Sequence, residues 1–182
     1  MTSPAGATPP AVRETSRVLL LDHRDRLLLL CARDPRPAGG RWWFTVGGGV
    51  DEGEDAPAAA VRELREETAL DLPAERLGPV VWTRRTDFTF DGRPVRQWEE
   101  YRLLRLTPAE TAAVRVDPVE AGFGHHWWTV RELAATDATV RPHHLAARLT
   151  ALLHDGPGPV PLHLGDVNDD EGQEASGRAS AG

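Results

Sequence analysis

The chain contains a single cysteine, Cys31, among 182 residues. One thiol cannot form an internal disulfide, and it excludes a zinc site built from several cysteines. The sequence also has no apolar run that approaches the length of a membrane span, and its first ten residues have neither the basic start nor the apolar core of a secretion signal. We therefore expect a cytoplasmic protein that does not contact a membrane.

Positive charge is also in short supply. Lys and Arg number 21 against 28 Asp and Glu, which gives a formal net charge of -7. A surface that holds nucleic-acid phosphates nonspecifically needs clustered positive charge, so no nucleic-acid partner is expected. The hydrophobic content of 40% is enough for one ordinary core, and a chain of this length is most often one domain.

Composition divides the chain into three parts. Residues 1–12 are rich in Pro, Ala, Gly and Thr and are interpreted as a flexible arm. Residues 13–155 form the expected domain, and residues 156–182, rich in Pro, Gly and acids, are interpreted as a disordered acidic tail.

Within the domain, apolar and aromatic runs predict strands on both sides of a central helix. The expected strands are residues 16–22, 26–33 (where leucine also allows a helix), 41–50 (interrupted by glycines), 125–130, and a hairpin of 80–90 with 93–106 around Asp91-Gly92. The expected helices are residues 55–68, with Asp55 as N-cap, a short one near 131–136, and 141–155. This pattern indicates a mixed α/β domain.

The central helix carries three neighbouring acids, Glu63, Glu66 and Glu67. Side chains three and four residues apart share a helix face, and like charges at that spacing weaken a helix by roughly 0.2–0.5 kcal/mol per pair. Such a face is most often simply solvated. Here, however, a glycine-rich turn with a further acid, residues 47–54, comes directly before the helix. Clustered carboxylates suit Mg²⁺ or Mn²⁺, and Mg²⁺ commonly completes its shell with substrate phosphate.

The spacing of these residues resembles the Nudix box, G-x5-E-x7-R-E-U-x-E-E-x-G-U, where U is apolar. The matching positions are Gly48, Glu54, Arg62, Glu63, Leu64, Glu66, Glu67 and Leu70. Ala69 stands where the family has glycine, and alanine in the left-handed conformation expected there costs about 1 kcal/mol. Val46 also replaces a proline that is common before the glycines.

This resemblance covers about residues 15–153 and implies the Nudix α/β/α sandwich with a mixed sheet. It implies metal-dependent hydrolysis, by water, of the pyrophosphate bond of a nucleoside triphosphate or a nucleoside diphosphate-linked compound. The implied metal ligands are Glu63, Glu66, Glu67 and the Gly48 carbonyl, with Glu63 either binding metal or orienting a water. Arg62 is implied to pair with Glu54 and to fix the glutamates.

A general base is expected from a loop before the last strand, as in many members of the family. Glu120 is the best positional match, and Glu99 and Glu100 are alternatives, with Glu99 on the side of Tyr101 and Glu100 on the other. Trp43 and Arg84 are the candidate substrate-binding residues, although core packing and a solvated strand position are the commoner fates of such side chains. The histidine pairs at 125–126 and 143–144 are expected to be structural or surface residues, and Cys31 to be buried.

Other functions are compatible with the same residues. A catalytically weak Nudix domain that senses a nucleotide is the main alternative, although a binder has no need to keep every acid of the box. An isomerase with this box has only Cys31 in its support, and a purely structural domain leaves the glycine turn unexplained. The expected partner is a small nucleotide substrate, and a homodimer is favoured because many relatives are dimers.

Overall fold

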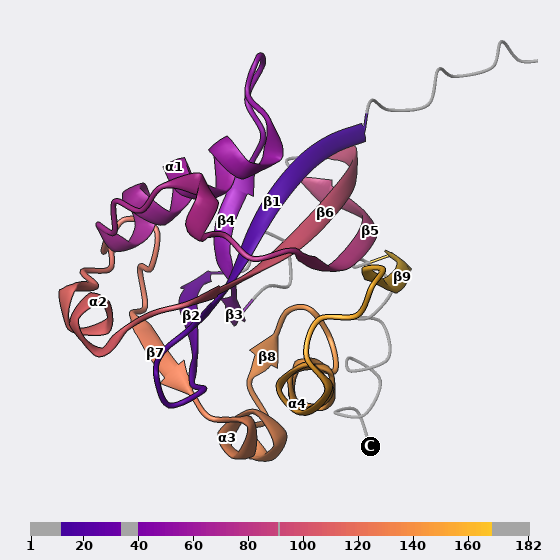
Figure 1. Ribbon diagram of the computed structural model, residues 1–182. Helices are drawn as coiled ribbons and strands as arrows, with labels where there is room; N and C mark the ends of the chain where they lie inside the picture. Colours follow the sequence, from indigo (N-terminus) through magenta and orange to yellow (C-terminus); the bar gives the residue numbers. More distant parts are fainter. Residues whose placement is uncertain (1–11, 34–39, 91, 169–182) are drawn as a thin grey trace, which may run out of the picture.

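The computed structural model describes residues 12–33, 40–90 and 92–168 (Figure 1). The elements in chain order are β1 (Val12–Leu21), β2 (Leu27–Arg33), β3 (Arg41–Phe44), β4 (Val46–Gly49), α1 (Ala56–Thr68), the 3₁₀ turn η1 (Ala74–Arg76), β5 (Val80–Phe90), β6 (Arg93–Arg105), α2 (Pro108–Ala113), β7 (His125–Trp128), α3 (Val130–Ala135), β8 (Thr139–Val140), α4 (Leu145–Asp155) and β9 (Leu162–Asn168). The predicted hairpin is present as the antiparallel pair β5–β6. No helix in this part of the chain is long and apolar enough to cross a membrane.

Strand β1 lies in the middle of a mixed sheet with the order β8-β3-β2-β1-β6-β5-β9, to which β4 and β7 are added on β1 and β2. It runs parallel to β6 and antiparallel to β2 and β4. Val18, Leu19, Leu20 and Leu21 are all fully buried. A strand that is apolar on both faces has to be covered on both sides, and this requirement places β1 between two layers of helix.

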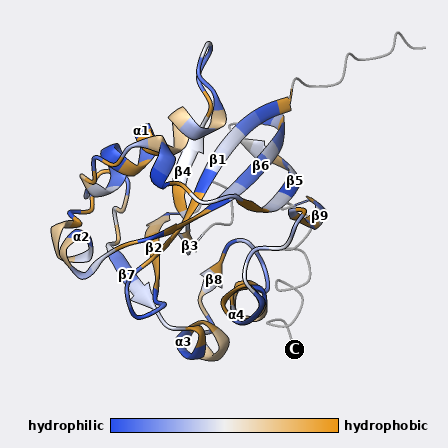
Figure 2. Ribbon diagram, in the orientation of Figure 1, coloured by the Kyte–Doolittle hydropathy of each residue, from blue (hydrophilic) through white to orange (hydrophobic). Residues whose placement is uncertain are grey.

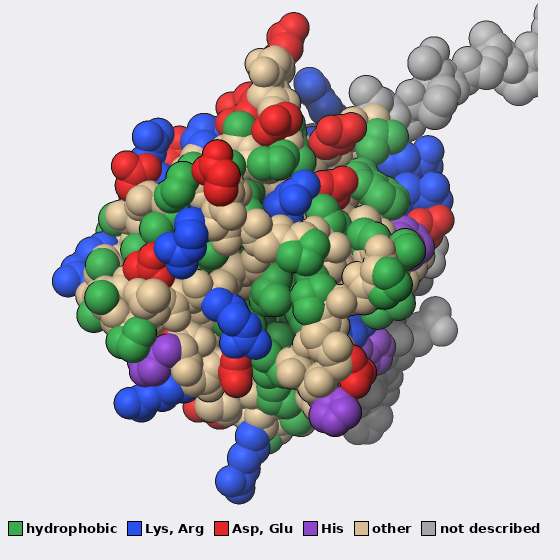
Figure 3. Space-filling model, in the orientation of Figure 1, with side chains coloured by type: hydrophobic (Ala, Val, Ile, Leu, Met, Phe, Trp, Pro, Cys, Tyr) green, Lys and Arg blue, Asp and Glu red, His purple; other side chains and the backbone are tan. Residues whose placement is uncertain are grey.

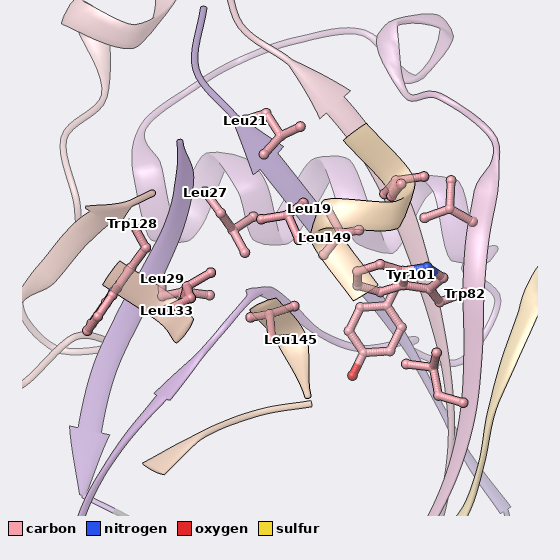
Figure 4. Packing of buried hydrophobic residues seen from close by; sticks show 13 residues of the cluster. Leu19, Leu21, Leu27, Leu29, Trp82, Tyr101, Trp128, Leu133, Leu145 and Leu149 are labelled. Atoms are coloured by element: carbon pink, nitrogen blue, oxygen red, sulfur yellow. The ribbon is translucent and has the colours of Figure 1, made fainter. Parts of the chain in front are cut away.

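The two faces of the sheet form two separate cores. On one face, Leu19 and Leu21 pack with α4, and Figure 4 shows Leu149 of α4 next to Leu19, with Trp82 beside Tyr101. On the other face, Val18 and Leu20 belong to the cluster that contains α1 residues Ala60 and Leu64. Figure 2 shows hydrophobic residues concentrated in the second half of β1 and in β2. The α/β/α sandwich predicted from the family resemblance is therefore confirmed.

Helix α1 begins and ends where the sequence predicts. The Asp55 side chain accepts a hydrogen bond from the Ala58 N–H at 2.8 Å and caps the first turn. At the other end, Ala69 adopts the left-handed conformation, with φ 58° and ψ 13°, and its N–H donates to the Arg65 carbonyl at 2.9 Å. The backbone thus keeps the conformation that glycine adopts most easily, although the residue is alanine.

Two expectations are corrected by the structure. The strand predicted over residues 41–50 is divided at Thr45 into β3 and β4, and not at the glycines, because β4 continues to Gly49 and pairs with β1. The tail predicted to be disordered from Gly156 is ordered at residues 162–168, which form β9 along β5. The Pro- and Gly-rich composition hid this strand, since its hydrogen bonds come from a partner that is distant in sequence. The predicted arm up to residue 11 and the tail beyond 168 lie outside the described residues.

Replacing Ala69 by Gly is expected to raise the free energy of unfolding by about 1 kcal/mol, because glycine removes the steric cost of the left-handed conformation. Urea unfolding measures the change. The matched control is Ala151→Gly, at an exposed position inside α4, which is expected to lose about 1 kcal/mol. An equal loss in both variants would contradict the assignment of strain to Ala69.

Candidate active site

Gly47 brings β4 into very close contact with β1. Its φ is 123°, and a Cβ added there would lie 2.2 Å from the Ser16 carbonyl oxygen. Any side chain would therefore push the two backbones apart. The Gly47 N–H is left pointing away from β1, and it donates a hydrogen bond to Glu67 Oε2 at 2.8 Å. This contact joins the glycine turn to the last turn of α1.

Glu67 is a buried carboxylate, with only 3% of the residue exposed. Burial raises its pKa to about 8, and the nearby charges of Glu63 and Glu120 add to the increase. The Gly47 N–H and the Arg17 guanidinium favour the ionised form, but not enough to offset burial. A carboxylate in this position gains from any nearby cation.

Arg62 sits between the glycine turn and the acids of α1. Its Nη2 donates to Glu54 Oε2 at 2.9 Å and to the Gly49 carbonyl at 2.8 Å, and its Nε donates to Glu54 Oε1 at 3.1 Å. Its Nη1 reaches Glu63 Oε1 at 2.8 Å and Glu66 Oε2 at 3.4 Å. The hydrogen bonds from Arg62 lower the pKa of Glu54, and those to Glu54 raise the pKa of Arg62. One guanidinium therefore ties the turn to the helix.

Glu63 and Glu66 are both hydrogen-bonded to Nη1 of Arg62. A Cβ added to Gly48 would lie 2.2 Å from Glu63 Oε1, so the Glu63 carboxylate is packed directly against the Gly48 backbone. The Glu66 side chain is 52% exposed. Figure 3 shows acidic side chains grouped over the upper part of the molecule, around α1 and the turn before it. Within residues 12–33, 40–90 and 92–168, no three His, Cys, Asp or Glu side chains converge closely enough to surround a metal ion.

The residues nevertheless fit a hard divalent cation by their chemistry. Every candidate ligand is an oxygen, as Mg²⁺ and Mn²⁺ prefer. Burial raises the pKa of the Glu67 carboxyl, and a bound cation would favour its ionised form. The Glu63 carboxylate also lies directly against the Gly48 backbone.

Glu120 is exposed, in the turn that precedes β7. The segment before this turn is attached to the end of α1, since the Arg115 N–H donates to the Thr68 carbonyl at 2.8 Å and the Asp117 N–H donates to the Glu67 carbonyl at 2.9 Å. Glu120 is then close enough for its charge to raise the pKa of Glu67. Two parts of the chain that are far apart in sequence thus meet at the acidic helix.

The alternative bases and the substrate-binding candidates have other surroundings. Glu99 points to the side of Tyr101, as predicted, but it is buried and accepts hydrogen bonds from Arg84, Gln97 and Tyr101. Arg84 is itself buried in this ion pair, with Nε 2.5 Å from Glu99 Oε2, so it does not occupy an open substrate surface. Trp43 packs edge-on against Trp128, at 5.0 Å between ring centroids, beside the core below α4.

The remaining reactive side chains lie away from the acidic helix. Cys31 is buried, as expected. The four histidines of the two pairs are all exposed, and His126 pairs with Glu132 at 3.3 Å. They are surface residues, as predicted.

Sequence reasoning missed Arg17, which links the site to the Glu99 pair. Its Nη1 donates to the Gly47 carbonyl at 2.5 Å, and its Nε lies 3.8 Å from Glu99 Oε1. The signal was present in the strand pattern: strand alternation places Arg17 on the same face as Leu19 and Leu21, where a charge needs a partner.

Similar sequences are found among known proteins. Among curated proteins, the dihydroneopterin triphosphate diphosphatase of Escherichia coli K12 is 40% identical over 76 residues, which is 42% of this chain and 42% of that protein. The match thus spans less than half of the relative's length.

Solved structures share the fold. The MutT protein from Methanosarcina mazei Go1 superposes with a TM-score of 0.59 at 14% identity, over 84% of this chain and 100% of that one. The E. coli dihydroneopterin triphosphate pyrophosphohydrolase gives 0.56 at 20% identity, over 80% and 99%. A Caenorhabditis elegans Ap4A hydrolase gives 0.55 at 21% identity, over 79% and 99%.

The sequence model of the NUDIX domain matches residues 12–149, which include the glycine turn, all of α1 and Glu120. That range covers most of the chain, and within it Arg62 is hydrogen-bonded to Glu54, Glu63 and Glu66 of the box. The chain belongs to the Nudix family.

Proposed function

We propose that this protein is a hydrolase that cleaves the P–O–P bridge of a nucleoside triphosphate or of a nucleoside diphosphate linked to another group. The observation that carries the proposal is the buried Glu67 carboxylate, held against Gly47 and near the charges of Glu63 and Glu120. A protein that needed only stability would gain by replacing such a carboxylate with an apolar side chain. Its cost is explained if the carboxylate binds a cation.

Glu63, Glu66, Glu67 and the Gly48 carbonyl would hold a divalent cation, Mg²⁺ or Mn²⁺. When bound, such a cation lowers the pKa of a water molecule and neutralises charge on the phosphates. Arg62 fixes the glycine turn to the helix, because it donates hydrogen bonds to Glu54 and to the Gly49 carbonyl. Its charge also limits the repulsion between Glu63 and Glu66, to both of which it is hydrogen-bonded.

Glu120 is the proposed general base. Its carboxylate would take one proton from the attacking water while the water oxygen forms a bond to phosphorus. The bridging P–O bond then breaks, and its electron pair leaves with the departing phosphate. Glu120 suits this role because it is solvent-exposed and lies at the end of α1, whereas Glu99 is enclosed by hydrogen-bond donors.

The names of similar proteins support a substrate class. One of them is named for dihydroneopterin triphosphate and another for Ap4A, and both names describe a polyphosphate attached to a small heterocyclic group. We propose a soluble polyphosphate ester of this kind as the substrate. Arg84 does not contact the substrate in this proposal, because its side chain is buried in an ion pair with Glu99. We also propose that the protein acts in the cytoplasm, where a single buried thiol such as Cys31 stays reduced.

A panel of dihydroneopterin triphosphate, nucleoside triphosphates, dinucleoside polyphosphates and nucleotide sugars tests the activity. At least one compound is expected to be cleaved with Mg²⁺ and none with chelator, and analysis of the products identifies the phosphorus attacked. Changing Glu63, Glu66 and Glu67 together to Gln is expected to abolish turnover, whereas Glu75→Gln, at an exposed position in η1, leaves it unchanged. Tight binding without any cleavage would favour the nucleotide sensor instead.

Replacing Glu120 by Gln tests the general base. The expected result is a fall in kcat of roughly 10²–10⁴-fold, the usual range for losing a general base. KM is expected to change little, because the proton is transferred after the substrate has bound. Unchanged turnover would remove Glu120 from the mechanism, and Glu75→Gln again serves as the control.

The Glu67→Gln variant is expected to be more stable than the natural protein in chelator at pH 8, by about 1–3 kcal/mol. The pKa of Glu67 is raised by folding to about 8, so the folded protein is expected to lose stability as the pH rises from the ordinary carboxyl pKa towards 8. The amide cannot ionise and escapes that loss. Thermal unfolding from pH 5 to pH 9 measures the effect, and parallel pH profiles for the two proteins would contradict it. Added Mg²⁺ is expected to raise the Tm of the natural protein only.

A further inference from the structure

Arg17 reaches from the central strand to the backbone of the box. It lies on β1, its side chain is only 16% exposed, and its Nη1 donates to the Gly47 carbonyl at 2.5 Å. Its Nε faces Glu99 Oε1 at 3.8 Å. The guanidinium thus spans two partners that belong to different strands, β4 and β6.

Glu99 is a fixed anchor for this guanidinium. Arg84 Nε donates to Glu99 Oε2 at 2.5 Å, the Tyr101 hydroxyl donates to the same oxygen at 2.8 Å, and Gln97 Nε2 donates to Oε1 at 2.8 Å. Burial opposes the charge of Glu99, but Arg84 and Arg17 more than compensate, and the pKa of Glu99 lies below its usual value. A carboxylate bonded from three directions cannot change its rotamer without losing buried hydrogen bonds. Arg17 is therefore held at its far end by a rigid group.

The other end of Arg17 binds one of the two peptide groups that flank the Gly47 Cα. The peptide before Gly47 donates its N–H to Glu67, and the peptide after it presents its carbonyl to Arg17. Glycine at φ 123° has no side chain to restrict its rotation, so hydrogen bonds have to do so. The second of these peptides leads directly into Gly48, whose backbone lies against the Glu63 carboxylate.

We propose that Arg17 is a positioning residue for the divalent-metal site and that Glu99 is the anchor that holds Arg17 in place. The proposal rests on the proposed function, since it assumes that Gly48 and the box glutamates bind a cation. Arg17 does not touch the cation or the substrate. It fixes the peptide groups on either side of Gly47, so that the Gly47 N–H holds Glu67 in place before metal arrives.

A purely structural ion pair would behave differently. If Arg17 served only to neutralise Glu99, its loss would lower the melting temperature and leave the metal affinity of the folded protein unchanged. If it positions Gly47, the folded variant binds metal more weakly, because binding must then pay for ordering the turn. Metal affinity measured well below the melting temperature separates the two roles.

The test measures the binding of Mn²⁺ alone, by the electron paramagnetic resonance signal of the free ion, to the full chain without substrate. Arg17→Gln is expected to weaken Mn²⁺ binding by roughly 10–100-fold, the usual cost of losing a group that orients metal ligands. Arg17→Lys is expected to recover part of this loss, because an ammonium can donate to the Gly47 carbonyl but lacks the planar fork needed to face Glu99 as well. The Mg²⁺ concentration for half-maximal turnover is expected to rise in the same order, with kcat at saturating Mg²⁺ within a few-fold of the natural protein.

Arg76→Gln is the matched control, since it breaks an arginine–glutamate pair with Glu110 that has no contact with Gly47. If folded Arg17→Gln binds Mn²⁺ as tightly as the natural protein does, the inference is overturned. If Arg17→Gln fails to fold, the Mn²⁺ affinity of Arg17→Lys is the test. An affinity equal to that of the natural protein again overturns the inference. A natural protein that binds Mn²⁺ and cleaves substrate while both variants match it refutes only the role of Arg17. A natural protein that binds no Mn²⁺ refutes the proposed metal chemistry and this inference together.

Discussion

The hydrogen bond from the Gly47 N–H to the Glu67 carboxylate is the contact on which the whole site depends. It requires a residue without a side chain at position 47, because β4 approaches the Ser16 carbonyl too closely for a Cβ. It also requires the last turn of α1 to reach back over the sheet, which the packing of Ala60 and Leu64 on β1 ensures. The sheet, the turn and the helix are therefore aligned by a single donor and acceptor pair.

The charges around this contact are arranged in two groups. On the side of α1, Arg62 bonds to Glu54, Glu63 and Glu66. On the opposite side of the glycine turn, Arg17 and Arg84 share the buried Glu99. Two guanidiniums bind carbonyls of the turn: Arg62 binds that of Gly49, and Arg17 binds that of Gly47. The backbone between them is held from both sides, as a preorganised binding site requires.

Much of the fold could be predicted because local signals and tertiary structure agree. The Asp55 cap, the apolar stripe of α1 and the Asp91-Gly92 hairpin each depend on residues that are close in sequence. Strand β9 could not be predicted, because Gly165 and the prolines before it conceal a segment that pairs with β5. Helix α2 was not predicted, and α3 was predicted only approximately. Both begin with capping boxes that can be found in the sequence, Thr107 with Glu110 and Thr129 with Glu132.

The candidate site was predictable to the same extent. Fixed spacing identified the glutamates and Arg62, because one helix and one turn carry them. The roles of Arg84 and Glu99 depend on the register of β5 against β6, which pairs these two residues directly. No pattern within either strand specifies that register, so a candidate substrate contact became half of a buried ion pair. Trp43 likewise packs against a core whose members come from strands and helices along the whole domain, from β1 to β9.

Strand β9 also limits how copies of this protein can associate. It covers the β5 edge, yet it is a poor edge itself, since Gly165 has a φ of 102° and the pairing with β5 shifts register between Thr83 and Arg85. Bulged, charged edges discourage the addition of further strands. At the other end of the sheet, β8 has only two residues. A continuous sheet across two copies is therefore disfavoured at both β9 and β8.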